Sequence, residues 1–120
     1  MHQMAFFDEL TQLPNYHLVI DRLTQTMAIS KRSGGFCALM MLDLDNFKAL
    51  SELRGHMVGD LLLMEVARRP TNYVREVDTV GRFGGDEFVV ALGEFSVDKA
   101  VSTAQAATIA EKVRLSLAEP

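Results

Sequence analysis

The sequence predicts a mixed α/β fold in a single domain of 120 residues. Three observations support this prediction. Apolar residues recur at helical spacing in several segments, short apolar runs have the length of strands, and the turn RFGGD (82–86) separates two of these runs. The expected order of elements is helix, strand, helix, helix, strand, strand, helix. Such an order is typical of helices packed on a sheet that contains one hairpin.

Composition favours a soluble protein and excludes several classes of function. Hydrophobic residues make up 48% and charged residues 23%, with a net charge of −4 and no dense run of Lys or Arg, so we expect no nucleic-acid partner. The single cysteine, Cys37, excludes an internal disulfide. No apolar run reaches the ~18 residues that a membrane span requires. We therefore expect a cytoplasmic domain, which could belong to a membrane-bound parent protein.

The first half of the chain predicts a loop, a helix and a buried strand. Residues 8–15 form an entry loop that ends at Asn15, a residue type that caps helix starts. Apolar residues at helical spacing predict a helix over 16–31, and the glycines at 34 and 35 should end it. The nearly continuous apolar run 36–44 predicts a buried strand.

The second half predicts three helices and a hairpin. A short helix is expected over 46–53 and a longer one from Met57 or Val58, which Pro70 should end or kink. Its apolar residues are expected in the core: Met57, Leu61–Met64 and Val66. Strands over 77–81 and 87–92 should be joined by the RFGGD turn, and 97–117 should form the last helix. No strand follows that helix, so we expect that a C-terminal part of the domain is missing.

Acidic residues follow two of the expected strands. Asp43 ends the 36–44 strand, and Asp86 and Glu87 follow the two hairpin glycines. If the hairpin pairs beside the 36–44 strand, Asp43 and Asp86 converge at one end of the sheet and could hold Mg²⁺. Gly84 and Gly85 would then let a phosphate approach the backbone. An ordinary hairpin turn and a helix-capping aspartate are the alternatives that spacing leaves open.

Four motifs together resemble the GGDEF domain family, the bacterial diguanylate cyclases. They are DELTQLPN (8–15), LDLDNFK (42–48), GHMVGD (55–60) and RFGGDEF (82–88), and they span almost the whole chain. The resemblance implies a nucleotide-cyclase-like fold, with a central mixed β-sheet wrapped by helices and the GGDEF motif on a β-hairpin. It implies condensation of two GTP molecules into cyclic di-GMP and two pyrophosphates, with Mg²⁺ or Mn²⁺. It also implies a second GGDEF domain during catalysis and an N-terminal sensor or receiver domain in the parent protein.

The resemblance assigns roles to individual residues. Asp43, Asp86 and the Leu44 carbonyl would hold the metal, and Glu87 would assist the 3′-hydroxyl or hold a second ion. The catalytic residues would be Asp86, Glu87 and Lys48. The triphosphate would meet Lys48, the backbone N–H groups of Asn46 and Phe47, and the glycines Gly84 and Gly85. Asp60 would accept from the guanine N1–H and 2-amino groups.

A second ligand site is implied upstream of the hairpin. Arg75 and Asp78 match the family's RxxD site, at which the product cyclic di-GMP binds and inhibits the enzyme. Arginine can donate several hydrogen bonds to guanine or phosphate, and aspartate can accept from guanine. An ordinary ion pair between residues three apart is the alternative.

The sequence departs from the family at several positions. Ser51 stands where the family has a guanine-binding Asn, and one hydroxyl cannot supply the paired geometry of an amide. His56 is interpreted as a structural residue beside a turn glycine. The family's final strand and its basic last helix have no counterpart in the 120 residues, so weak or absent activity is expected of the fragment. A cyclic di-GMP or GTP sensor module, or a dimerising piece without a ligand, remain the alternatives to the enzyme.

Overall fold

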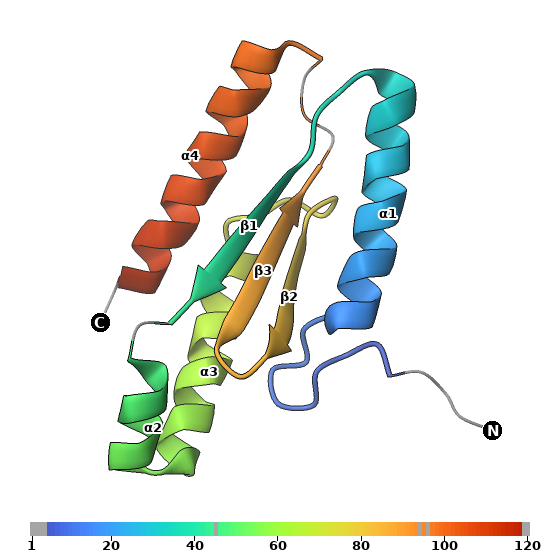
Figure 1. Ribbon diagram of the computed structural model, residues 1–120. Helices are drawn as coiled ribbons and strands as arrows, with labels where there is room; N and C mark the ends of the chain where they lie inside the picture. Colours follow the sequence, from blue (N-terminus) through green and yellow to red (C-terminus); the bar gives the residue numbers. More distant parts are fainter. Residues whose placement is uncertain (1–4, 45, 94, 96, 119–120) are drawn as a thin grey trace, which may run out of the picture.

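The computed structural model describes residues 5–118 apart from 45, 94 and 96, and it confirms the mixed α/β class. In this part of the chain the predicted order of elements holds (Figure 1). The elements are α1 (Tyr16–Ser33), β1 (Ala38–Asp43), α2 (Phe47–Arg54), α3 (His56–Thr71), β2 (Thr79–Gly84), β3 (Glu87–Leu92) and α4 (Lys99–Ala118). No helix within the described ranges is both long and apolar enough to cross a bilayer.

The ends of α1 are set by the residues that the sequence indicates. The Asn15 side chain accepts a hydrogen bond from the Leu18 N–H at 3.1 Å, which satisfies one of the free donors of the first turn. At the other end Gly34 adopts a left-handed conformation with φ 79°, and its N–H donates to the Ser30 carbonyl. Both predicted signals are therefore confirmed, and the helix ends two residues later than expected.

The boundaries of α3 differ from the prediction at both ends. The helix begins at His56, directly after Gly55, whose φ of 97° turns the chain between α2 and α3. Pro70 does not end the helix, since α3 continues through it to Thr71. Proline removes one donor, and in the last turn that loss affects a single hydrogen bond. The helix then closes with the Asn72 N–H donating to the Arg69 carbonyl at 3.2 Å.

The sheet has the strand order β1-β3-β2, and both pairings are antiparallel. The hairpin thus pairs beside β1, which is the condition for the acidic residues to converge. The resemblance implies a mixed sheet, whereas the described strands are all antiparallel. The predicted five-residue turn is also wrong, because β2 extends to Gly84 and the turn is Gly85 and Asp86 alone. A register shift between Arg82 and Gly84 leaves Phe83 as the extra residue of a bulge.

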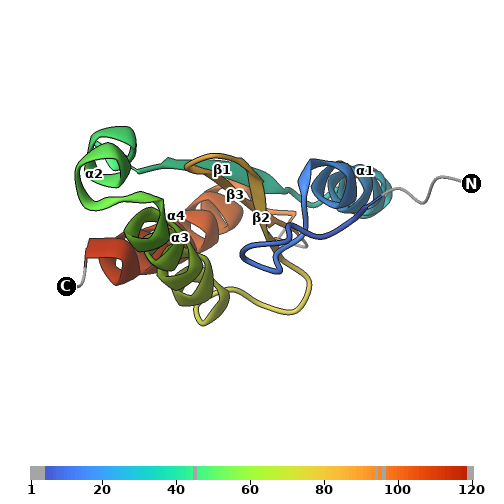
Figure 2. The same ribbon diagram turned by 90° about the horizontal axis from the view of Figure 1, so that it is seen from below.

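The core lies between the sheet and the pair α3 and α4, whereas α1 lies on the other side, next to β2 (Figure 2). Buried residues of this core include Leu63, Val66, Val80, Phe88, Val90 and Leu92. The expectation of a wholly buried apolar face on α3 is wrong for Met57, Leu61 and Met64, which are 81%, 64% and 47% exposed. A helix packed on a sheet buries only one stripe, and these three residues lie outside it.

Gly81 lets α1 approach β2 closely, and this contact yields a stability prediction. A Cβ at Gly81 would overlap Val19 Cγ2 and lie 2.9 Å from the Pro14 carbonyl oxygen. We expect Gly81→Ala to lower the free energy of unfolding by about 1–3 kcal/mol because of this overpacking. Urea denaturation followed by circular dichroism measures the change. In a Val19→Ala background the cost should be smaller, and an equal cost in both backgrounds would contradict the contact.

Candidate functional site

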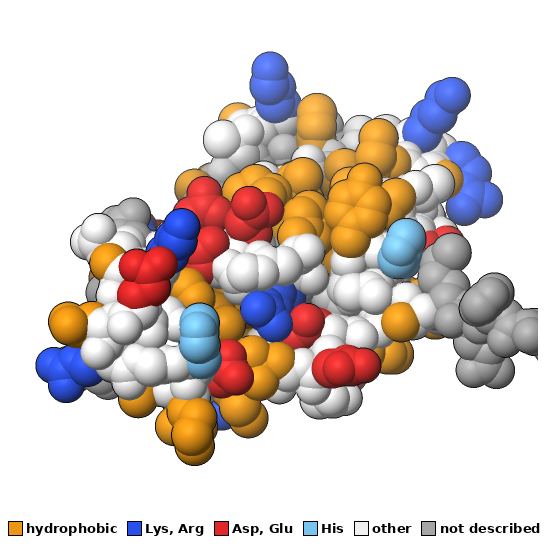
Figure 3. Space-filling model, turned by 60° about the horizontal axis from the view of Figure 1, so that its bottom comes forward, with side chains coloured by type: hydrophobic (Ala, Val, Ile, Leu, Met, Phe, Trp, Pro, Cys, Tyr) orange, Lys and Arg blue, Asp and Glu red, His pale blue; other side chains and the backbone are white. Residues whose placement is uncertain are grey.

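Three carboxylates lie at the end of the sheet where β1 stops and β3 starts. Asp43, the last residue of β1, is directly opposite Glu87, the first residue of β3, and Asp86 occupies the turn just before it. Like charges placed directly opposite each other on antiparallel strands repel. None of the three carboxylates forms an ion pair with a described residue. Figure 3 shows this end of the molecule, with acidic side chains gathered on it.

The donor set fits a magnesium ion that takes most of its ligands from elsewhere. Among the described residues, no three His, Cys, Asp or Glu side chains lie close enough to form a metal site on their own. Magnesium is commonly held by one or two carboxylates together with waters and substrate phosphates. Asp43 and Asp86 offer hard oxygen ligands that form no ion pair within the described part of the chain. Asp45, the neighbouring acid of the same motif, lies outside the described residues.

The glycine turn leaves open space beside these carboxylates. Gly84 has φ 144° and Gly85 has φ 49°, conformations that residues with a side chain rarely adopt. A Cβ at either position would meet nothing within 4 Å. The backbone here is therefore accessible to a ligand, as the sequence predicts. The role of either glycine in binding a phosphate stays a prediction.

Arg82, a residue to which the sequence motifs assign no role, holds the turn in place. Its Nε and Nη2 donate to the Gly85 carbonyl at 3.0 and 2.9 Å, and its Nη1 donates to both Asp8 carboxylate oxygens at 3.2 and 3.0 Å. Asp8 belongs to the entry loop, 74 positions away in sequence. One guanidinium thus ties the start of the domain to the turn that carries Asp86. The sequence signal for this role is a charged arginine two residues before the first glycine of the RFGGD segment.

The Asp8 carboxyl is held in its charged form. Burial raises its pKa, but hydrogen bonds from the backbone and side chain of Thr11 and from Arg82 outweigh that effect and lower the pKa below its ordinary value. Because the folded-state pKa is the lower one, this stabilisation is present above the unfolded pKa. It is lost as the pH falls through the folded pKa.

The replacement Asp8→Asn tests this linkage. Asparagine keeps an acceptor for Thr11 but removes the charge that faces Arg82. We expect the urea midpoint of the variant to lie below that of the wild type at neutral pH, and the difference to shrink below about pH 4. Urea titrations at a series of pH values measure it. A difference that is the same at pH 3 and pH 7 would show that the charge has no part in it.

A cavity of about 370 Å³ adjoins the turn. It is lined by Phe47, Lys48, Ser51 and Glu52 of α2, His56 of α3, and Gly85 and Asp86 of the turn. The fold therefore brings Lys48 and Ser51 together with the glycine turn, although the two motifs are far apart in sequence. Lys48 is exposed and forms no ion pair with a described residue, so its charge is available to an anionic ligand.

Ser51 is fixed within this cavity. The residue is only 8% exposed, and its Oγ is 3.3 Å from His56 Nδ1. The helices α2 and α3 pack closely at Gly59, where a Cβ would lie 2.8 Å from the same Oγ, so a larger residue there would displace the Ser51 side chain. His56 and Glu52 are thus cavity residues that the sequence motifs do not assign to the site.

Asp60, Asn46 and Leu44, three other predicted site residues, lie outside the cavity lining. Asp60 is exposed on α3, four residues after His56 and so on the same side of the helix. Asn46 has φ 59° and its side chain makes no capping hydrogen bond. The Phe47 N–H donates to the Leu44 carbonyl at a long 3.4 Å, so these two backbone groups, both predicted to meet ligands, face each other.

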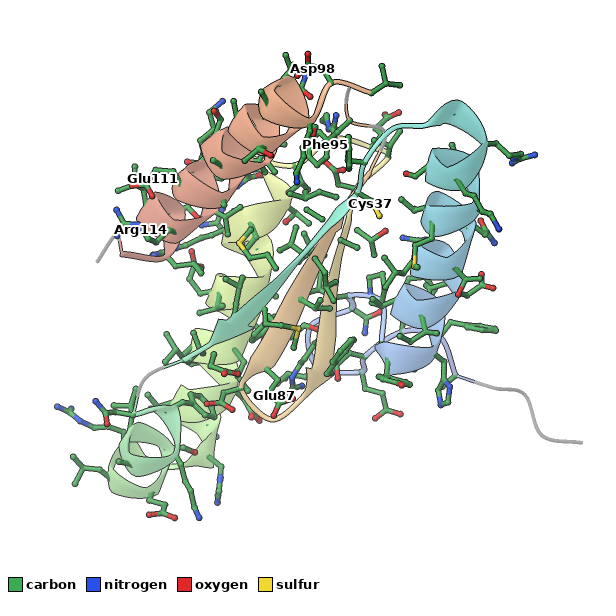
Figure 4. All side chains as sticks on the ribbon, turned by 45° about the horizontal axis from the view of Figure 1, so that its top comes forward. Cys37, Glu87, Phe95, Asp98, Glu111 and Arg114 are labelled. Carbon is green, nitrogen blue, oxygen red and sulfur yellow. The ribbon has the colours of Figure 1, made fainter. Side chains whose placement is uncertain are left out.

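Arg75 and Asp78 form a closed pair at the other end of the sheet. The Asp78 side chain has no exposed surface and accepts from the backbone N–H, Nε and Nη2 of Arg75 and from the Gly93 N–H, at 2.9–3.1 Å. The Arg75 guanidinium also lies over the Phe95 ring, 4.7 Å from its centre. Figure 4 labels Phe95 and Glu87 at opposite ends of the sheet. The carboxylate is therefore saturated, and its part in product binding stays a prediction.

The chain matches known proteins over nearly its full length. The family model described as diguanylate cyclase, GGDEF domain, matches residues 5–119. A bifunctional diguanylate cyclase/cyclic di-GMP phosphodiesterase of Pseudomonas aeruginosa, MucR, is 44% identical over 118 residues, which are 98% of this chain and 16% of that protein. The chain thus spans a small part of this longer relative.

Solved structures give the same result for the fold. The GGDEF domain of TpbB (YfiN) from Pseudomonas aeruginosa is 34% identical with a TM-score of 0.87, over 95% of this chain and 63% of that one. The GGDEF domain of DgcB from Caulobacter crescentus, solved in complex with c-di-GMP, is 27% identical with a TM-score of 0.82, over 96% and 62% of the two chains. The motifs, the fold and these matches agree, and the chain belongs to the GGDEF domain family of diguanylate cyclases.

Proposed function

We propose that the chain is the GTP-binding part of a diguanylate cyclase, which condenses two GTP molecules into cyclic di-GMP and two pyrophosphates. The observation that supports this most directly is the cavity in which Lys48 and Ser51 face Gly85 and Asp86. It offers a basic side chain, an open backbone and the Asp86 carboxylate, which forms no ion pair with a described residue. These are the groups that a metal-bound nucleoside triphosphate requires.

The phosphates occupy the turn end of the cavity in this proposal. Asp43, Asp86 and the Leu44 carbonyl would hold Mg²⁺ or Mn²⁺, which would supply charge neutralisation and polarise the α-phosphate. Lys48 neutralises the outer phosphates, and the backbone at Gly84 and Gly85 lies along the triphosphate. Arg82 keeps this backbone in its binding conformation through the Gly85 carbonyl.

The chemistry joins two nucleotides held on two domains. The 3′-oxygen of one GTP attacks the α-phosphorus of the other, the bond to the β-phosphate breaks, and pyrophosphate leaves. Glu87, exposed beside Asp86, takes the proton of the attacking hydroxyl. Repetition in the opposite direction closes the ring. A second GGDEF domain is therefore required during the reaction.

The surroundings of the domain follow from the substrate and from the size of the relatives. GTP is a cytoplasmic nucleotide, so the domain works on the cytoplasmic side of any membrane. MucR is about six times as long as the matched segment. In this proposal the parent protein of this chain is also longer and carries a sensor or receiver domain before residue 1.

A sensor module is the second candidate, and one observation favours it. A hollow of about 350 Å³ lies between α1 and the segment that contains Arg75 and Asp78, lined by Arg22, Gln25, Thr26, Ile29, Glu76, Val77 and Thr79. An arginine and a carboxylate there could meet a guanine nucleotide. In this reading the domain binds cyclic di-GMP without making it.

A product assay separates the two candidates. The parent protein that contains this chain is incubated with GTP and Mg²⁺, because weak or absent activity is expected of the 120 residues alone. Cyclic di-GMP and pyrophosphate are separated by chromatography, beside a Glu87→Gln variant of the same protein. Product from the wild type and none from the variant is the result expected of the cyclase. Binding of cyclic di-GMP with no turnover by either protein would favour the sensor module.

A further inference from the structure

We propose that His56 reads the O6 atom of guanine and that Ser51 is the positioning residue that orients its imidazole ring. The inference rests on the proposed function, because it assumes that the cavity beside the glycine turn holds a guanine nucleotide. It goes further by assigning the base specificity of this chain to a pair of residues on two helices. The pair occupies the part of the cavity built by α2 and α3, away from the turn that meets the phosphates.

The hydrogen bond between the two side chains decides which group His56 presents to a ligand. Ser51 Oγ lies 3.3 Å from His56 Nδ1, and no other hydrogen bond of this hydroxyl is found among the described residues. A nearly buried hydroxyl needs an acceptor for its hydrogen, and Nδ1 is the acceptor within reach. In the neutral ring Nε2 then carries the hydrogen. In the charged ring both nitrogens donate, so Nε2 is a donor in either state.

A donor in this place distinguishes guanine from adenine. Guanine carries the acceptor O6 at position 6, where adenine carries an amino group that donates. A side chain that can only donate therefore favours guanine. With adenine, the donor of the side chain would face the amino group of the base, which is also a donor. Two donors that face each other leave both groups without an acceptor. This costs more free energy than the simple absence of a hydrogen bond.

Acidic side chains nearby complete the pattern for guanine. Glu52 lines the same cavity, and Asp60 follows His56 by one helical turn on α3. A carboxylate accepts from the N1–H and the 2-amino group, which are next to O6 on the same edge of the base. One donor next to a carboxylate that accepts two hydrogen bonds matches this edge of guanine. Two separate side chains would thus take the place of the guanine-binding Asn that the family has at position 51.

Binding of nucleotides altered at single positions tests the assignment. The dissociation constants of GTP, 6-thioguanosine 5′-triphosphate and inosine 5′-triphosphate are measured by titration calorimetry with Mg²⁺. Sulfur at position 6 accepts hydrogen bonds poorly, so we expect the thio compound to bind the wild type about 3–10-fold more weakly than GTP. In His56→Ala this ratio should fall close to one, while the ratio of inosine triphosphate to GTP stays unchanged, because it reports the 2-amino contact.

Two further variants make the result specific. His17→Ala removes an exposed histidine from α1, away from the cavity lining, and should keep every wild-type ratio. Ser51→Ala frees the ring and should reduce the penalty for sulfur part of the way. An unchanged penalty in His56→Ala overturns the O6 contact, and an unchanged penalty in Ser51→Ala overturns the positioning role. A wild type that binds no GTP overturns the proposed function itself and this inference with it.

Discussion

In the parent protein, Asp86→Asn is expected to reduce cyclic di-GMP formation by about 10³-fold, because a metal that polarises the phosphate contributes several kcal/mol to the transition state. Asparagine keeps the size of the side chain and one oxygen, but it removes the negative charge that holds the cation. Asp86 sits in a turn and forms no ion pair with a described residue, so the fold should survive the change. The initial rate as a function of Mg²⁺ concentration measures both the loss and the weaker metal affinity.

The matched control for this experiment is Asp21→Asn. Asp21 is exposed on α1 and its only recorded side-chain contact among the described residues is a hydrogen bond from Gln25, so the same chemical change there should leave the rate unaltered. If Asp86→Asn keeps the wild-type rate and the wild-type Mg²⁺ dependence, the carboxylate is not a metal ligand. A fall in rate with an unchanged Mg²⁺ dependence would likewise assign Asp86 a different role.

The largest effect on stability is expected at the other end of the sheet. Asp78→Ala removes a fully buried carboxylate and leaves the Arg75 guanidinium and the Gly93 N–H without their acceptor. Breaking a buried pair on one side typically costs about 3–5 kcal/mol. Arg75 is 40% exposed and can be rehydrated, so we expect a loss of about 2–4 kcal/mol in the free energy of unfolding. Urea denaturation measures it.

Glu76→Ala provides the comparison for this second prediction. Glu76 lies in the same segment with an exposed side chain and no ion pair among the described residues, so its removal should change stability by less than about 0.5 kcal/mol. Equal losses in the two variants would contradict a structural role for the Asp78 carboxylate. The expected result also bears on product inhibition. A loss of cyclic di-GMP binding in Asp78→Ala means little unless the variant is shown to be folded.

Local patterns in the sequence predicted the order of the elements and placed acidic residues at one end of the sheet. Short apolar runs gave the strands, and antiparallel pairing then required that the end of β1 lie beside the start of β3. Asp43 and Glu87 are opposite each other for that reason. The length of the turn was not predictable. The bulge at Phe83 extends β2 to Gly84, and the residue types alone do not specify the pairing register that produces this bulge.

Contacts between segments that are distant in the sequence could not be predicted from local patterns. Arg82 meets Asp8 only because the entry loop returns beneath β2, and no local spacing relates them. The pairing of Ser51 with His56 depends on the angle between α2 and α3, which Gly55 and Gly59 together allow. The exposure of Met57 and Leu61 likewise reflects which stripe of α3 faces the sheet, a choice made by tertiary packing.

The most direct test of the central claim is a paramagnetic measurement on the chain with GTP. The claim is that the carboxylates at the end of β1 and in the hairpin turn hold a metal-bound triphosphate. Mn²⁺ is added in small amounts to the isotope-labelled protein with GTP, and the broadening of each backbone amide signal is recorded. We predict that broadening is strongest at residues 43–44 and 84–87 and at Lys48, and that it vanishes in Asp86→Asn. Strong broadening centred elsewhere, or the same pattern in the variant, would contradict the account.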